Sequence, residues 1–174
     1  MTLPRLSLVL GGAASGKSAF AEGLVKSGPA RPTYIATSQV HDDEMAAKVA
    51  AHRAMRGEDW TTIEEPLDIA AALTTAPADA PVLIDCATLW LTNVILGEHD
   101  LDAAQRDFLA AIAAAGRPVV VVSNETGQGI VPENALARRF RNAQGRLNQA
   151  IAAQADLVVV VMAGLPMVLK GKLS

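Results

Sequence analysis

A segment near the start of the chain has the residue types and the spacing that bind the phosphates of a nucleoside triphosphate. Its pattern is G-x-x-x-x-G-K-S, which follows an apolar run and precedes helix-favouring sequence. Glycines let successive backbone N–H groups turn toward phosphate oxygens, and the positive end of the following helix strengthens the attraction. The lysine would act in catalysis by neutralising the outer phosphates, and the serine hydroxyl would hold a magnesium ion. The segment consists of Gly11, Gly12, Ala13, Ala14, Ser15, Gly16, Lys17 and Ser18.

An aspartate further along the chain is a candidate partner for that metal ion. Asp85 ends the apolar run 82–84, as the acidic residue of phosphate-loop enzymes does when its carboxylate supports Mg²⁺. An aspartate at this position can also simply cap the helix that follows. Because the phosphate loop is present, we interpret Ser18 and Asp85 as metal-binding residues. Mg²⁺ is the expected cofactor, and GTP or ATP is the expected nucleotide.

A histidine in the middle of the chain could act as a nucleophile. On a helix, His52 shares a face with Met45 and Val49 and lies next to two arginines, Arg53 and Arg56. Nearby cations disfavour the imidazolium, and the neutral ring keeps a nitrogen lone pair that can attack phosphorus. A histidine packed against a helix surface fits the same residues, so the pattern alone leaves both interpretations open.

Short apolar runs alternate with longer alanine-rich stretches, which is the pattern of a parallel sheet wrapped by helices. The apolar runs are 6–10, 33–36, 82–85, 119–123 and 157–162, with a possible edge strand at 166–169. The helix-favouring stretches are 17–27, 42–56, 67–73, 87–96, 102–115 and 133–153. The sequence predicts an α/β fold of the RecA-like P-loop NTPase class, with a mostly parallel central sheet, in a single domain over 1–174.

Four of the predicted strands run directly into small or polar residues. In an open parallel sheet the carboxyl ends of the strands share one edge, where ligands bind. We therefore expect these clusters to converge on one site. They are the phosphate loop, then Thr37, Ser38 and Gln39, then Asp85, and finally Asn124 and Glu125.

Composition argues against several classes of function. A net charge of -3 and aromatic residues that are scattered along the chain argue against a nucleic-acid partner. Cys86, the single cysteine, can form no intramolecular disulfide, which suits a reducing compartment, so we expect a cytoplasmic protein. The first residues lack the pattern of a signal peptide, and Gly164 and Pro166 interrupt the longest apolar stretch, so we expect no membrane span.

Over nearly all of its length the chain resembles the bifunctional adenosylcobinamide kinase / adenosylcobinamide-phosphate guanylyltransferase family of cobalamin biosynthesis. The resemblance rests on GGAASGKS at 11–18, YIATSQVHDDEM at 34–45, HRAMRGEDWTTIEEP at 52–66, VLIDCATLWLTN at 82–93 and SNETGQGIVPENALARRFRNAQGRLNQ at 123–149. It implies an enzyme that phosphorylates the aminopropanol hydroxyl of adenosylcobinamide. The same enzyme then transfers GMP from GTP onto that phosphate and releases pyrophosphate.

The resemblance also implies roles for individual residues. In such enzymes GMP is carried on a histidine in the helix after the second strand, and His52 is the histidine of this chain that fits. Nucleotide contacts are implied for Thr37, Ser38, Gln39, Arg53, Arg56, Glu64 and Asp85. Contacts with the corrinoid or with a neighbouring subunit are open to Arg138, Arg139 and Arg141, which could equally form an ordinary basic helix surface. The resemblance further suggests a homo-oligomer, specifically a trimer.

Two positions depart from the family pattern. Ala14 stands where arginine is usual inside the phosphate loop, and Asn142 stands where aspartate is common. The first change leaves the backbone cradle intact, and the second removes one charge.

Two other functions fit the phosphate loop. One is a P-loop kinase of another small hydroxyl compound without guanylyl transfer, and the other is a regulatory module that binds GTP or ATP and signals by a loop movement.

Overall fold

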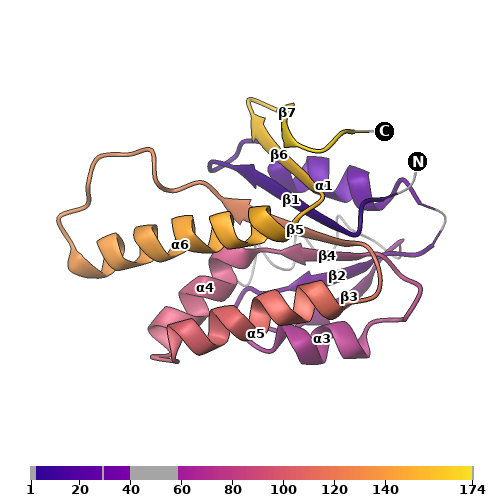
Figure 1. Ribbon diagram of the computed structural model, residues 1–174, viewed down its shortest axis with the longest axis horizontal. Coiled ribbons are helices and arrows are strands. Elements are labelled where there is room, and N and C mark those ends of the chain that lie inside the picture. The colour runs from indigo at the N-terminus through magenta and orange to yellow at the C-terminus, as the bar shows by residue number, and fades with distance from the viewer. Residues whose placement is uncertain (1–2, 29, 40–58, 174) are drawn as a thin grey trace.

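The computed structural model describes residues 3–28, 30–39 and 59–173. Within them the chain forms one sheet of seven strands in the order β3-β2-β4-β5-β1-β6-β7, with helices packed on it (Figure 1). All neighbouring strands are parallel except β6 and β7. The expected α/β fold with a mostly parallel sheet is confirmed. The strands are β1 (Leu6–Gly11), β2 (Thr33–Ala36), β3 (Thr61–Glu64), β4 (Val82–Asp85), β5 (Val119–Asn124), β6 (Leu157–Met162) and β7 (Leu165–Lys170). The helices are α1 (Lys17–Val25), α3 (Ile69–Thr75), α4 (Ala87–Leu96), α5 (Leu101–Ala114) and α6 (Ala135–Gln154).

Alternate residues of the central strands are buried in two different apolar clusters. In β5, Val119 and Val121 belong to the cluster that contains residues of α3, α4, α5 and α6. Val120 and Val122 belong to the cluster that contains residues of α1. A strand that is covered on both faces needs apolar residues at every position. This is why the continuous apolar runs of the sequence identify the central strands.

The edge strands follow a different rule. The sequence pattern does not predict β3, because three of its four residues, Thr61–Glu64, are polar and none of them is buried. The strand nevertheless pairs with β2 in parallel register. At the other edge, the possible strand at 166–169 is confirmed as β7, all of whose residues are exposed. Neither edge strand is buried, so the sequence pattern is a poorer guide there: β3 is mostly polar, whereas β7 is apolar although it is exposed.

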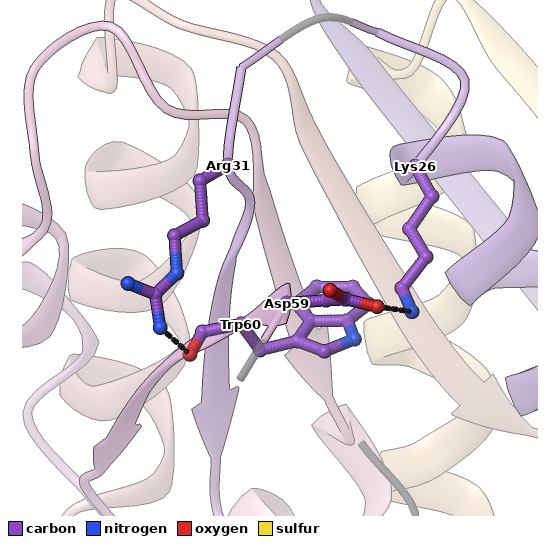
Figure 2. A network of polar contacts seen from close by, with 4 residues as sticks. All are labelled: Lys26, Arg31, Asp59 and Trp60. Atoms are coloured by element: carbon purple, nitrogen blue, oxygen red, sulfur yellow. Dashed lines mark hydrogen bonds and ion pairs between the residues drawn. The ribbon is translucent and has the colours of Figure 1, made fainter. Parts of the chain in front are cut away.

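The expected helix at 42–56 lies outside the described residues, and the chain is described again from Asp59. The carboxylate of Asp59 pairs with Lys26 Nζ at 3.5 Å. The carbonyl oxygen of Trp60 accepts a hydrogen bond from Arg31 Nη2 at 2.8 Å, and Lys26 Nζ lies 5.4 Å from the centre of the indole ring. Figure 2 shows this network, which attaches the start of β3 to α1 and to the segment that enters β2.

The longest of the described helices, α6, is amphipathic. Its apolar side chains recur at helical spacing, and the later ones, Ala143, Leu147 and Ile151, are buried in the main core. Its arginines, Arg138, Arg139, Arg141 and Arg146, are exposed or half-buried. None of the described helices, α6 included, has the length and apolarity that crossing a membrane demands.

Leu147→Ala should destabilise the fold by about 2–5 kcal/mol, because it leaves a cavity under α6 where the leucine is fully buried. Urea unfolding followed by circular dichroism measures the change. Leu169→Ala is the matched control, since Leu169 is 59% exposed on β7. It should change the free energy of unfolding by less than about 0.5 kcal/mol. Equal losses for both variants would contradict the packing described here.

Candidate active site

The phosphate loop connects β1 to α1 and depends on a close backbone approach at its first glycine. A Cβ atom on Gly11 would lie 2.3 Å from Ser15 Oγ and 2.7 Å from the carbonyl oxygen of Val161. Gly16 has a φ of 92° and Ala14 a φ of 53°, so both adopt left-handed conformations. These conformations curl the backbone between the strand and the helix. A backbone curled in this way can turn successive N–H groups toward an anion.

The turn between β6 and β7 braces this loop. The N–H of Gly164 donates to the carbonyl oxygen of Ser15 at 2.9 Å. A Cβ atom on Gly16 would lie 3.1 Å from the Cα atom of Gly164, so the two glycines pack directly on each other. Sequence reasoning missed this contact. The Ala163-Gly164 pair between two apolar runs is a hairpin-turn signal, but it does not identify the segment that the turn contacts.

Lys17 and Ser18 lie in the first turn of α1. Lys17 Nζ donates to the carbonyl oxygen of Gly12 at 3.1 Å, so the side chain folds back over the loop. Burial and Asp85 raise the pKa of the thiol of Cys86, which caps α4, and the charge of Lys17 opposes them by lowering it. Ser18 follows in the helix and is half-buried. An ammonium group and a hydroxyl therefore stand at the positive end of α1, where phosphate oxygens are attracted.

Asp85, at the end of β4, is held by a residue that the sequence analysis did not assign to the site. Tyr34 Oη donates to Asp85 Oδ2 at 2.8 Å. Tyr34 lies opposite Leu83 in the parallel register of β2 and β4, so Asp85 projects on the same face two residues further on. The phenol ring is buried and meets the ring of Trp60 edge-on, with centroids 5.6 Å apart. The direction of the carboxylate is therefore fixed from within the core.

Thr37 ties the end of β2 to the start of α4. Its Oγ1 donates to the carbonyl oxygen of Cys86 and accepts from the N–H of Cys86, both at 2.8 Å. Asn93 Nδ2 donates to the carbonyl oxygen of Thr37 at 2.7 Å. The side chain of Thr37 is thus buried and helps to shape the edge of the sheet. Ser38 and Gln39 follow it and are half-buried. A nucleotide contact of these three residues stays a prediction.

Cys86 is not suited to act as a nucleophile. Burial, and then the neighbouring Asp85 carboxylate, raise the pKa of its thiol to about 11. The thiol therefore stays protonated near neutral pH, whereas nucleophilic attack requires the thiolate. Its sulfur instead accepts a hydrogen bond from the N–H of Leu89 at 3.4 Å and caps α4.

The end of β5 meets the phosphate loop. Asn124 is the sheet partner of Gly11, and the N–H of Glu125 donates to the carbonyl oxygen of Gly11 at 3.0 Å. The N–H of Asn124 donates to Thr88 Oγ1 at 2.8 Å, and its carbonyl oxygen accepts from Asn148 Nδ2 at 3.1 Å. The expected convergence is confirmed, because the ends of β1, β2, β4 and β5 lie at one edge of the sheet.

Two arginines of α6 hold the loop at 125–134, which follows β5. Contacts with the corrinoid or a neighbouring subunit, or an ordinary basic helix surface, were expected for them, and this attachment was not predicted. Arg139 lies between them and is exposed. From Nη1, Arg138 donates to the carbonyl oxygens of Pro132 and Glu133, and Arg141 to those of Gly129 and Ile130.

Four expected site residues remain, and the structure describes one of them. Glu64 ends β3 beside Ala36, at the same edge of the sheet as the phosphate loop, and is exposed. His52, Arg53 and Arg56 lie outside the described residues. Their roles therefore stay predictions.

Comparison with known proteins identifies a family that this chain matches. Residues 7–169 match the family model described as "Cobinamide kinase / cobinamide phosphate guanyltransferase". The bifunctional adenosylcobalamin biosynthesis protein CobP of Pseudomonas aeruginosa is 45% identical, over 95% of this chain and 97% of that protein. The bifunctional adenosylcobalamin biosynthesis protein CobU of Salmonella typhimurium is 42% identical, over 94% of this chain and 98% of that protein.

Solved structures of much lower identity share the fold. The flagellar accessory protein FlaH of Methanocaldococcus jannaschii matches 98% of this chain and 80% of its own, with a TM-score of 0.53 and 13% identity. A prototypical ATPase from the type III secretion system of pathogenic bacteria matches 91% of this chain and 51% of its own, with a TM-score of 0.53 and 12% identity. These likenesses confirm the RecA-like P-loop NTPase class of fold.

Gly11→Ala should weaken nucleotide binding by about tenfold or more, because the added methyl group collides with Ser15 and Val161 and displaces the N–H groups of the loop. Titration with a fluorescent GTP analogue measures the dissociation constant. Gly12→Ala is the control, since a Cβ atom there would have no atom within 4 Å. It should bind nucleotide as the wild type does. Unchanged binding by Gly11→Ala would show that the loop does not need this close approach.

Proposed function

This chain belongs to the cobinamide kinase / cobinamide phosphate guanyltransferase family, and we propose that it catalyses both reactions of adenosylcobinamide activation. The observation that carries the proposal is the phosphate loop, which is curled at Gly11, bonded to Glu125 and placed at the same sheet edge as Asp85, in a chain with relatives of 42–45% identity. The first reaction would phosphorylate the corrinoid. The second would attach GMP to the new phosphate.

In the kinase reaction, the acceptor hydroxyl oxygen forms a bond to the γ-phosphorus of the nucleotide while the bond from that phosphorus to the leaving diphosphate breaks. The hydroxyl proton would pass to a base at this edge of the sheet, for which the carboxylates of Asp85 and Glu125 are the two candidates. The loop amides and Lys17 would hold the outer phosphates and offset the negative charge on the transferred group. The close contact between Lys17 and Gly12 keeps the ammonium over the loop, which supports this role.

Ser18 and Asp85 would hold Mg²⁺ together with the nucleotide. Both offer oxygen atoms, which this ion prefers, and Tyr34 fixes the carboxylate of Asp85. The described residues contain no group of three or more His, Cys, Asp and Glu side chains that could hold a metal ion. Ser18 and Asp85 alone are few ligands, which suits Mg²⁺ because this ion usually also binds the phosphate oxygens of the substrate. When bound, it would neutralise charge between the phosphates.

In the guanylyl transfer, His52 would attack the α-phosphorus of GTP, and the bond to the departing pyrophosphate would break. A phosphate oxygen of the phosphorylated corrinoid would then attack the same phosphorus, and the bond to the histidine nitrogen would break. Family membership and the arginines beside His52 in the sequence support this step. Arg53 and Arg56 would clamp the phosphate charge that builds during transfer. The trimer suggested by the family resemblance belongs to the same proposal.

Incubation with GTP labelled at the α-phosphate should leave label on the protein, because the first half of the transfer forms a phosphorus–nitrogen bond. The label should resist alkali and be lost in acid. His52→Asn should abolish it and still phosphorylate adenosylcobinamide. His99→Asn, a substitution at an exposed histidine, should keep the label.

Two outcomes would change the proposal. If the wild type phosphorylates adenosylcobinamide but takes no label, the protein is a P-loop kinase without the covalent guanylyl step. If it binds nucleotide and turns over no corrinoid, the regulatory alternative gains support.

Asp85→Asn should raise the Mg²⁺ concentration for half-maximal kinase rate by about tenfold, since a neutral amide replaces a charged metal ligand while it can still accept from Tyr34. Initial rates over a series of Mg²⁺ concentrations measure the shift. Asp107→Asn, a substitution at an exposed position of α5, should leave the Mg²⁺ dependence unchanged. An unaltered dependence in Asp85→Asn would remove Asp85 from the metal site.

A further inference from the structure

A cavity of about 590 Å³ opens between α4, α6 and the loop at 125–134. Its walls are mostly apolar. Thr92, Ile95, Leu96, Thr126, Pro132, Asn134, Leu136, Ala137, Phe140 and Arg141 line it.

The cavity exists because α6 is longer than the part of it that packs on the sheet. Its apolar residues recur every three or four positions, beginning with Leu136 and Phe140 and continuing through Leu147. Leu147 is fully buried, whereas Leu136 is 47% exposed. Figure 1 shows the first half of α6 and the loop before it extending beyond the sheet. The apolar stripe of the helix therefore continues past the core that its second half covers.

The facing wall is apolar and exposed as well. Leu96, the last residue of α4, is 61% exposed at the cavity. The adjoining loop carries Ile130, which is 96% exposed, and Val131. Arg138 and Arg141 hold this loop by its carbonyl oxygens, so it stays in place over α6. Exposed apolar surface of this kind usually marks a binding site.

One wall residue of the cavity follows the segment that bonds to the phosphate loop. Thr126, which lines it, follows Glu125 directly, and the N–H of Glu125 donates to Gly11. Thr126 Oγ1 is buried and has no hydrogen-bond partner among the residues that the structure describes. A buried hydroxyl without a partner costs free energy, so this end of the cavity is not optimised for stability alone.

We propose that this cavity binds the corrin ring of the phosphoryl acceptor, an inference that rests on the function proposed above. A corrinoid has broad apolar faces and a rim of amide groups. It must also bring a hydroxyl group to the phosphate loop. The cavity offers apolar walls for the ring and the guanidinium of Arg141 for the phosphate of the product.

A second cavity of about 590 Å³ between α3 and α5 fits this ligand less well. Asp68, Asp100 and Asp107 line it, and their charges would repel the product phosphate. No residue of the phosphate loop or of the strand end at Asn124 lies in its walls. Charge and position therefore both favour the cavity beside Thr126.

The test is corrinoid binding measured apart from catalysis. Equilibrium dialysis of adenosylcobinamide, followed by the visible absorbance of the corrin ring, gives its dissociation constant. Leu96→Asp and Leu136→Asp place a carboxylate on the two walls of the cavity. Each should raise this constant by about tenfold or more, because the ring loses apolar contact and a charge must be desolvated. GTP binding should not change.

Leu169→Asp is the matched control, since Leu169 is as exposed as Leu96 and lies on β7. It should leave corrinoid binding unchanged. Leu96→Met should bind the corrinoid as the wild type does, unlike Leu96→Asp, because methionine keeps an apolar side chain of similar size.

Three results would overturn the inference, and they separate it from the proposed function. If the wild type phosphorylates adenosylcobinamide and both aspartate variants bind it normally, the ring lies elsewhere and the proposed function stands. If the variants lose corrinoid binding only together with a change in molecular mass, the cavity is an interface between copies of the chain. If the wild type neither binds nor phosphorylates adenosylcobinamide, the proposed function fails and this inference fails with it.

Discussion

The absence of a side chain at Gly11 is the constraint on which the site depends. Ser15 and the backbone of β6 approach this position so closely that a single methyl group would collide with both. That approach lets the loop turn back on itself before α1 begins. It also makes β6 part of the phosphate site, although Val161 lies far from Gly11 in the sequence. The β6–β7 turn extends the same support, because Gly164 packs on Gly16 and donates to Ser15.

Hydrogen bonds between neighbouring segments keep the rest of this edge in place. Thr37 joins the end of β2 to Cys86, and Thr88 joins the start of α4 to the end of β5. Glu125 then joins the end of β5 to Gly11. These bonds form when the chain folds, so the edge does not have to be ordered again when a nucleotide arrives. Preorganisation of this kind lowers the free-energy cost of binding.

How much the sequence could predict depends on whether a feature is local. The phosphate loop and the buried strands were predictable, because each is set by a short pattern of glycines or apolar residues. The strand β3 was not, because three of its four residues are polar. Tyr34 was missed as the partner of Asp85 because the contact depends on the register between β2 and β4. The brace at Gly164 was missed for a similar reason, since nothing near it in the sequence points to Ser15.

The arginines of α6 show how a basic helix face can hold a neighbouring loop as well as offer charge to a ligand. Their spacing and charge are typical of anion contacts, and sequence reasoning can go no further than that. In the structure Arg138 and Arg141 donate hydrogen bonds to the carbonyl oxygens of the loop after β5. This holds the loop against the half of α6 that extends beyond the sheet.

One helix therefore has two environments along its length. Its second half uses the apolar stripe to close the core, where Leu147 and Ile151 are fully buried. Its first half presents the same stripe to a cavity beside the phosphate loop. An apolar stripe left in water lowers solubility, so its continuation past the core needs a physical reason. A substrate with large apolar faces, delivered to the phosphate loop, supplies that reason and relates the length of α6 to the chemistry at Gly11.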